Sequence, residues 1–214
     1  MKKLKKAFLV CLCFVLVMGL SIVGTVAYLT DTDATKNTFT VGKVDISLDE
    51  AKVNPDGTLV DAAERVKENA YHLVPGQTYV KDPTVTVEGD SEEAYIRMLL
   101  VINCKAELDA IFAPDGMKLD EFFGGYSSAD WLYVGKTAQD NSLTYEFRYK
   151  ESVDPEGADK ALPPLFTSIT VPGFLDGDDM KSIENLSIDV YAHAIQKAGF
   201  DSAELAWLAF DARQ

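Results

Sequence analysis

The sequence has few of the side chains that carry nucleophilic or metal chemistry. Its 214 residues include only two histidines and three cysteines. No H-E-x-x-H run supplies a helix-borne zinc pair, and no serine stands in a G-x-S-x-G turn. The zinc site that remains open would combine His72 and His193 with a carboxylate. We therefore expect no catalytic residue and keep this two-histidine site as the alternative.

The scarcity of cysteine excludes an internal disulfide framework. Cys11 and Cys13 lie inside an apolar run near the N-terminus, and Cys104 ends the stretch "AYIRMLLVINC". If the apolar run is removed, Cys104 has no partner in its own chain. Its apolar neighbours predict a buried strand thiol rather than a nucleophile. A chain of this length can bury enough apolar surface to fold without cross-links.

Positive charge is also scarce. The chain has 20 lysines and arginines against 34 aspartates and glutamates, a net charge of −14. Because nucleic-acid binding depends on basic side chains that neutralise phosphates, this balance excludes nucleic acid as a partner. Anionic lipids and wall polymers would be repelled in the same way.

The N-terminus carries a secretion signal. Four lysines within residues 2–6 precede an uncharged apolar run from Ala7 to Val23, and small residues follow at Thr25 and Ala27. This order predicts a signal peptide, residues 1–27, cut before Tyr28. Loss of its four lysines makes the charge −18. The alternative is an uncleaved anchor, because residues 7–29 are long enough to cross a bilayer.

Short strands between turns predict an all-β fold. The strongest strand is 94–104, whose nearly continuous apolar character predicts a central position with both faces covered. Turns are predicted at 54–58 and at Pro75-Gly76. With no linker long enough to divide the chain, we expect a single β-sandwich domain over residues 38–214. Further strands are predicted at 39–48 with a bulge at Gly42, 84–87, 131–135, 142–150, 165–171 and 186–196.

Helices are predicted only at the periphery. Residues 106–123 favour a short helix among loops, within a region, 106–164, that we interpret as an insertion. Asp201 followed by Glu204 predicts a capping box at the start of a short C-terminal helix. The two tryptophans, in "SSADWLYVG" and "AELAWLAF", are interpreted as core anchors.

Two aspartate clusters are the remaining candidates for metal binding. Asp31 and Asp33 form one, and "DGDD" at 176–179 forms the other. Asp-rich loops can bind calcium, but neither cluster has the spacing of an EF-hand loop. On so acidic a chain, such clusters are expected by chance. We expect no cofactor, with calcium and zinc as the alternatives.

Several segments, taken in order, resemble the TasA/camelysin (CalY) family of proteins secreted by Gram-positive bacteria. "GTVAYLTD" spans the cleavage region, and "NTFTVGKVDISL" resembles the first strand of the family. "HLVPGQTYVKDPTVTVEG" resembles its L-x-P-G turn with the following strand. "AYIRMLLVI" and "LSIDVYAHAIQ" resemble later strands. Residues 106–164 match no part of the family, and the tail "GFDSAELAWLAF" is similar to that of clostridial-type relatives.

The resemblance implies a jelly-roll-like β-sandwich behind an N-terminal signal helix, and cleavage by a SipW-type signal peptidase. It implies that some members assemble into extracellular fibres, in which the N-terminal segment of one subunit completes a sheet of the next. It also implies the alternative of a camelysin-like cell-surface zinc metallopeptidase. The expected localisation is extracellular, at the cell surface or in the biofilm matrix.

Residues 28–37 are the candidate donor strand. They are polar and free of glycine, and begin with Tyr28, Leu29, Thr30 and Asp31. A strand-capable segment at a new N-terminus can add to an open sheet edge, where main-chain hydrogen bonds supply affinity. We therefore expect a structural subunit of a bacterial cell-surface or biofilm-matrix fibre that self-associates. The alternatives are a flexible leader, a minor accessory or anchoring subunit, and the metallopeptidase.

The charge of −18 generates a first prediction. Acid or divalent cations should promote association, because either reduces the repulsion between like-charged chains. Light scattering of the processed protein should therefore rise as the pH falls and as calcium is added. Scattering that stays constant under both changes would contradict this prediction.

Overall fold

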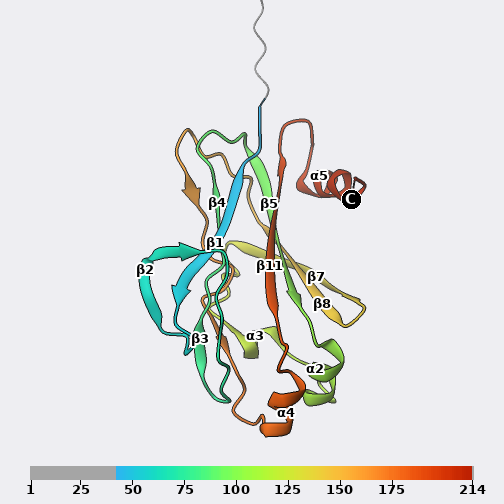
Figure 1. Ribbon diagram of the computed structural model, residues 1–214. Coiled ribbons are helices and arrows are strands. Elements are labelled where there is room, and N and C mark those ends of the chain that lie inside the picture. Colours follow the sequence, from blue (N-terminus) through green and yellow to red (C-terminus); the bar gives the residue numbers. More distant parts are fainter. Residues whose placement is uncertain (1–41, 214) are drawn as a thin grey trace, which may run out of the picture. The chain divides into compact units, whose positions relative to one another are not determined.

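Three antiparallel β-sheets organise residues 42–213, which are the residues that the computed structural model describes (Figure 1). The predicted signal helix, its cleavage site and the candidate donor strand lie outside these residues. The first sheet has the order β2-β1-β4-β9. Its strands are β1 (Ile46–Val53), β2 (Leu59–Val66), β4 (Thr84–Val87) and β9 (Lys160–Ala161).

The other two sheets complete the sandwich. One has the order β3-β10-β6 and the other has the order β11-β5-β8-β7. The strands of the smaller sheet are β3 (Thr78–Val80), β10 (Ser168–Thr170) and β6 (Phe123–Gly124). Those of the larger are β11 (Ile188–Gln196), β5 (Ala94–Ile102), β8 (Ser142–Tyr149) and β7 (Trp131–Gln139). The expected all-β sandwich with short peripheral helices is confirmed.

The core is built around β5, which lies between β11 and β8 as predicted. Its inward side chains from Ile96 to Ile102 are at most 1 % exposed, whereas Leu99 and Val101 on the opposite face are only half-buried. The prediction that both faces are fully covered is therefore wrong. Trp131 and Trp207 are both buried, which confirms them as core anchors. The inward residues of β5 join one hydrophobic cluster with Tyr79, Val85, Val87, Tyr145, Phe147, Phe166 and Ile169.

The first two strands differ from what the sequence predicted. The first strand was expected from residue 39 with a bulge at Gly42, but β1 begins at Ile46 and its register shifts occur around Lys52. Residues 39–41 lie outside the described part. The sequence did not predict β2, because "LVDAAERV" has no alternation of apolar residues. It forms a strand by pairing with β1 across the turn at 54–58, where Gly57 has φ +81°.

The described helices are short: α2 (Lys105–Ile111), α3 (Leu119–Phe122), α4 (Gly177–Ser182) and α5 (Ala203–Asp211). None of those between residues 42 and 213 has the length and apolar character that a membrane crossing requires. α5 begins after Ser202, whose side chain accepts a hydrogen bond from the Leu205 amide, so the prediction of Asp201 as N-cap is one residue early.

The "DGDD" cluster has a structural role. Asp176 is the N-cap of α4 and accepts from the amides of Asp178 and Asp179, while the Asp179 carboxylate accepts from the Asp176 amide. This is a capping box, which satisfies amides that the first helical turn leaves free. The helix terminus therefore gives the carboxylates of Asp176 and Asp179 a structural role.

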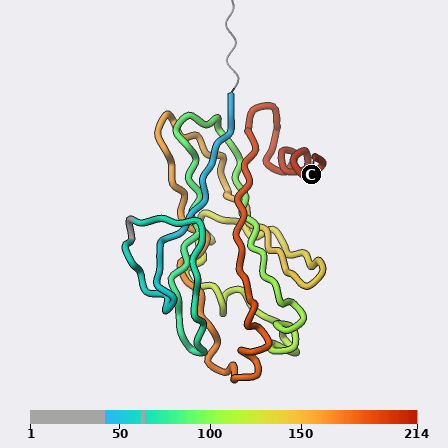
Figure 2. The backbone as a smooth tube through the Cα atoms, viewed as in Figure 1, coloured from blue at the N-terminus to red at the C-terminus, as the bar shows by residue number. Residues whose placement is uncertain are grey.

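Arg97 of β5 holds the C-terminal helix on the outer face of the large sheet. Its guanidinium lies 4.7 Å from the Trp207 ring and 4.9 Å from the Phe210 ring, and its Nη2 donates to Asp211 Oδ1 at 2.7 Å. Arg97 Nε donates to Nδ1 of His193 at 3.1 Å, and the His193 ring stacks on Phe210. Figure 2 shows the chain turning from β11 directly into this helix.

The environment of His193 predicts a pH-dependent stability. Burial, followed by the positive charge of Arg97, lowers the pKa of His193 below its ordinary value of 6.5. The unfolded chain then binds more protons, so this contribution to stability is present above pH 6.5 and is lost as the pH falls below it. Between pH 7.5 and 5, denaturant unfolding of the wild type should lose stability more steeply than that of His193→Asn.

The control for this experiment is His72→Asn, because His72 is exposed. Its pH profile should follow that of the wild type. Identical slopes for the wild type and His193→Asn would contradict the prediction.

Candidate functional site

An open seam runs between two strand edges, β1 and β11. On one side, β1 pairs with β4 over Ile46–Asp49, and on the other it pairs with β2 only from Glu50 onward. β11 pairs with β5 along its whole length, and its second edge ends the sheet. The two strands are neighbours without forming a ladder, and they separate toward the middle of the molecule (Figures 1 and 2). We call the gap between residues 46–50 and 188–191 the seam.

The seam contains a hollow of about 330 Å³. Its walls are Leu48, Asp49 and Glu50 of β1 and the first four residues of β11, from Ile188 to Tyr191. Lys67, Glu68 and Asn69, which follow β2, close it at one end together with Lys81 and Pro83. A hollow in this position separates two backbone edges and is open to solvent.

The hydrophobic core is incomplete along the seam. Ile46 and Leu48 of β1 pack on the core from one side, and Val190 and Ala192 of β11 pack on it from the other, yet all four are only partly buried. The equivalent side chains of β5, one strand further in, are at most 1 % exposed. Both rows therefore lack the cover that one more strand would give them.

A lysine side chain occupies the edge of β1. The Asp45 carbonyl accepts from the Glu88 amide on the β4 side. Because carbonyls alternate along a strand, that of Leu48 points to the opposite side, toward the seam. It accepts a hydrogen bond of 2.7 Å from Lys67 Nζ. The ammonium group thus stands where the amide of a neighbouring strand would stand.

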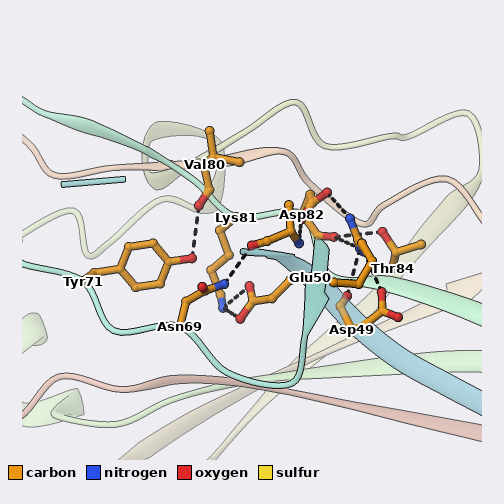
Figure 3. A network of polar contacts seen from close by, with 10 residues as sticks. Asp49, Glu50, Asn69, Tyr71, Val80, Lys81, Asp82 and Thr84 are labelled. Carbon is orange, nitrogen blue, oxygen red and sulfur yellow. Dashed lines mark hydrogen bonds and ion pairs between the residues drawn. The ribbon is translucent and has the colours of Figure 1, made fainter. Parts of the chain in front are cut away.

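A buried ion pair forms the floor of the seam (Figure 3). Lys81 Nζ lies 2.8 Å and 3.1 Å from the two carboxylate oxygens of Glu50, and the two side chains are only 8 % and 9 % exposed. The Lys81 ammonium also lies 5.7 Å from the centre of the Tyr71 ring. Burial, reinforced by the charges of Glu50 and Asp82, raises the pKa of the Tyr71 hydroxyl above its ordinary value. This hydroxyl donates to the Val80 carbonyl.

The pairing between β1 and β4 stops at Asp49 and Thr84. Beyond this point a second group of charged side chains binds the backbone of β1. Arg65 of β2 donates from Nε to Asp49 at 2.8 Å and from Nη1 to Asp82 at 2.7 Å. The other oxygen of Asp82 accepts from the Ala51 amide, and Asn69 donates to the Ala51 carbonyl. Figure 3 shows Asp49, Asn69 and Asp82 within this network. These contacts hold Asp49 and Ala51 of β1 in position on one side of the seam.

The comparisons with known proteins bear on the first half of the chain. The sequence model of the family described as camelysin metallo-endopeptidase matches residues 2–96. This match, which covers fewer than half of the 214 residues, supports the resemblance of the N-terminal part of the chain to the TasA/camelysin family. The match extends through β1, β2, β3 and β4 and ends at the start of β5, so it includes the β1 side of the seam but not β11. No curated protein and no solved structure matches the chain.

Because the matching family is one of metallo-endopeptidases, the two histidines are the first residues to consider as metal ligands. His72 lies in the loop before β3, where its amide donates to the Pro55 carbonyl and its carbonyl accepts from the Tyr79 hydroxyl. His193 lies on β11 with Nδ1 bonded to Arg97. Among residues 42–213, no three His, Cys, Asp or Glu side chains are grouped to hold a metal ion. The described part therefore gives no support to the zinc site of His72 and His193.

The other site residues predicted from the sequence fall into two groups. Thr25, Ala27, Tyr28, Leu29, Thr30 and Asp31 lie outside the described residues. Cys104 was predicted to be a buried strand thiol, but β5 ends at Ile102 and Cys104 is the half-buried N-cap of α2, so this prediction is wrong. Burial, together with the charge of Glu107, raises the pKa of its thiol, which makes it a poor nucleophile.

Sequence reasoning missed the residues that form the seam. Lys67, Asn69, Lys81 and Glu50 lie in segments without a recognisable motif, and only the folded chain brings them together. One signal was available: the alternation of "VDISL" and "IDVYAHA" identified two strands that each bury one face. It could not show that both strands present an unpaired edge to the same gap.

The ion pair in the floor leads to a prediction. Lys81→Met leaves the Glu50 carboxylate buried without a partner and should lower the free energy of unfolding by about 3–5 kcal/mol. The double variant Glu50→Met/Lys81→Met should recover most of this loss, because apolar replacement of both partners is often tolerated. Urea denaturation measures both effects.

Lys52→Met is the matched control. Lys52 pairs with Glu64 at 2.8 Å on the exposed surface, where ion pairs contribute little. This variant should unfold like the wild type. A Lys81→Met protein as stable as the control would show that the buried pair does not hold the floor.

Proposed function

We propose that this protein is a secreted structural subunit of a bacterial cell-surface or biofilm-matrix fibre. Subunits would assemble when the N-terminal segment of one copy adds as a strand to the seam of the next. The observation that carries the proposal is the seam, where two strand edges border an incomplete core. Strand addition is the interaction that unpaired edges favour.

The chemistry of the seam fits an extended chain better than a small ligand. The inward row of Ile46, Leu48, Val190 and Ala192 offers alternating apolar contacts, which suit every second side chain of a strand. The backbone of β1 offers hydrogen-bonding groups on the side away from β4. A strand inserted here would complete the partly buried rows and pair with both edges. The free energy of association would come from main-chain hydrogen bonds and from burial of apolar surface.

The proposed route to the fibre begins with secretion. Cleavage after Ala27, for which a SipW-type signal peptidase is the proposed partner, would release a new N-terminus at Tyr28. Residues 28–37 would then be free to act as the donor strand. A long unpaired strand edge tends to pair with other chains in any protein. In this protein the unpaired edges would serve assembly.

The match to a family of metallo-endopeptidases favours a second candidate, a cell-surface metallopeptidase. Its site would have to use ligands beyond those grouped within residues 42–213. Metal analysis of the purified protein separates the two candidates. Stoichiometric zinc with proteolytic activity would favour the peptidase, and metal-free protein that assembles would favour the structural subunit.

Deletion of the donor strand tests the proposed function. A protein that begins at Tyr28 should form fibres visible by electron microscopy, and one that begins at Asn37 should remain monomeric with unchanged circular dichroism. The double variant Thr30→Pro/Thr32→Pro in the longer protein should also stay monomeric, because proline removes the amides that pair with an edge.

The matched control is Thr30→Ser/Thr32→Ser, which keeps both amides and should still form fibres. Fibres from the protein that begins at Asn37, equal in yield to those of the longer form, would overturn strand addition by the N-terminal segment.

A further inference from the structure

Lys67 is the one basic side chain at the open rim of the seam that has no carboxylate partner among the described residues. The hollow is lined by four acidic residues, Asp49, Glu50, Glu68 and Asp189. Asp49 is paired with Arg65, and Glu50 is paired with Lys81. Within residues 42–213, the ammonium of Lys67 instead donates to the Leu48 carbonyl. The side chain is exposed and therefore free to move.

A strand that pairs with β1 must displace Lys67. The Leu48 carbonyl points into the seam, so the amide of an incoming strand would take the position that the ammonium holds at 2.7 Å. A displaced ammonium would return to water unless the incoming strand offers it an acceptor, and a carboxylate there would form a charge-assisted hydrogen bond with it.

The N-terminal segment supplies such an acceptor. Side chains alternate between the two faces of an extended chain, so Tyr28, Thr30, Thr32 and Ala34 share one face. Leu29, Asp31 and Asp33 share the other. Three of the four residues on the first face, Tyr28, Thr30 and Thr32, are of types that strands favour. The second face would carry two carboxylates along the rim, on the side where Lys67 is exposed.

We propose that Lys67 is the residue that determines which strand the seam accepts. In the free subunit it caps the Leu48 carbonyl and protects the edge. In the assembled state it pairs with the carboxylates of Asp31 and Asp33 of the incoming segment, so the seam selects a strand with acids on its outer face. This inference rests on the proposed function, since it needs an incoming strand.

A charge swap tests the pairing. Proteins that begin at Tyr28 are compared by light scattering at about 20 mM and 500 mM salt. Lys67→Glu alone and Asp31→Lys/Asp33→Lys alone should each slow assembly about tenfold at low salt, because steering and pairing are both lost. The combined variant should assemble at nearly the wild-type rate. The differences should shrink at high salt, where exposed charges are screened.

Lys52→Glu is the control, because Lys52 is exposed, pairs with Glu64 and does not line the hollow. Its effect at low salt gives the contribution of net charge alone, and Lys67→Glu must exceed it. Equal effects of the two substitutions, or no rescue in the combined variant, would overturn the role of Lys67 while strand addition stands. If the wild type does not assemble in any of these conditions, both the role of Lys67 and strand addition are wrong.

Discussion

The pairing of β1 is the constraint on which the described structure depends. On one side it is bound to β4 only as far as Asp49, and on the other it is bound to β2 only from Glu50. Because the partner changes along the strand, the first half of β1 pairs only with β4 and its other edge is open. Because backbone amides and carbonyls need partners, the protein satisfies the exposed carbonyl of Leu48 with a side chain. The seam follows directly from this arrangement.

A polar network lies where β1 changes its pairing partner from β4 to β2. Burial of Glu50 and Lys81 costs solvation energy that their attraction offsets only when the geometry is good. The two short contacts between them provide that geometry. Arg65, Asp82 and Asn69 then satisfy the backbone of β1 where no strand from β4 reaches it. These charged side chains hold β1 in position, while β11 remains the edge strand of its sheet.

The opposite wall is held from the outside. β11 pairs with β5, and α5 packs on their outer face through the contacts of Arg97 with Trp207, Phe210 and Asp211. The inward face of β11 keeps its partly buried row of alternate residues from Ile188 to Ala194. The helix thus anchors the sheet without covering the edge that faces β1. The contacts that hold each wall leave the edges of β1 and β11 that face each other unpaired with one another, so another chain could add there.

The sequence by itself determined the class of fold and most of its strands. Alternation and apolar runs located β4, β5, β8 and β11 within a few residues, because side-chain burial on a sheet follows a period of two. It also pointed to the TasA/camelysin family through the order of its first segments, which the match over residues 2–96 supports. It failed for β2, whose sequence lacks alternation and which forms by pairing with β1, and for the N-cap of α5, which is Ser202. Only the tertiary structure decided that the edges of β1 and β11 face each other and that Lys67 reaches Leu48. Such contacts join residues far apart in the chain, and no local pattern of side chains encodes which strand edges remain unpaired.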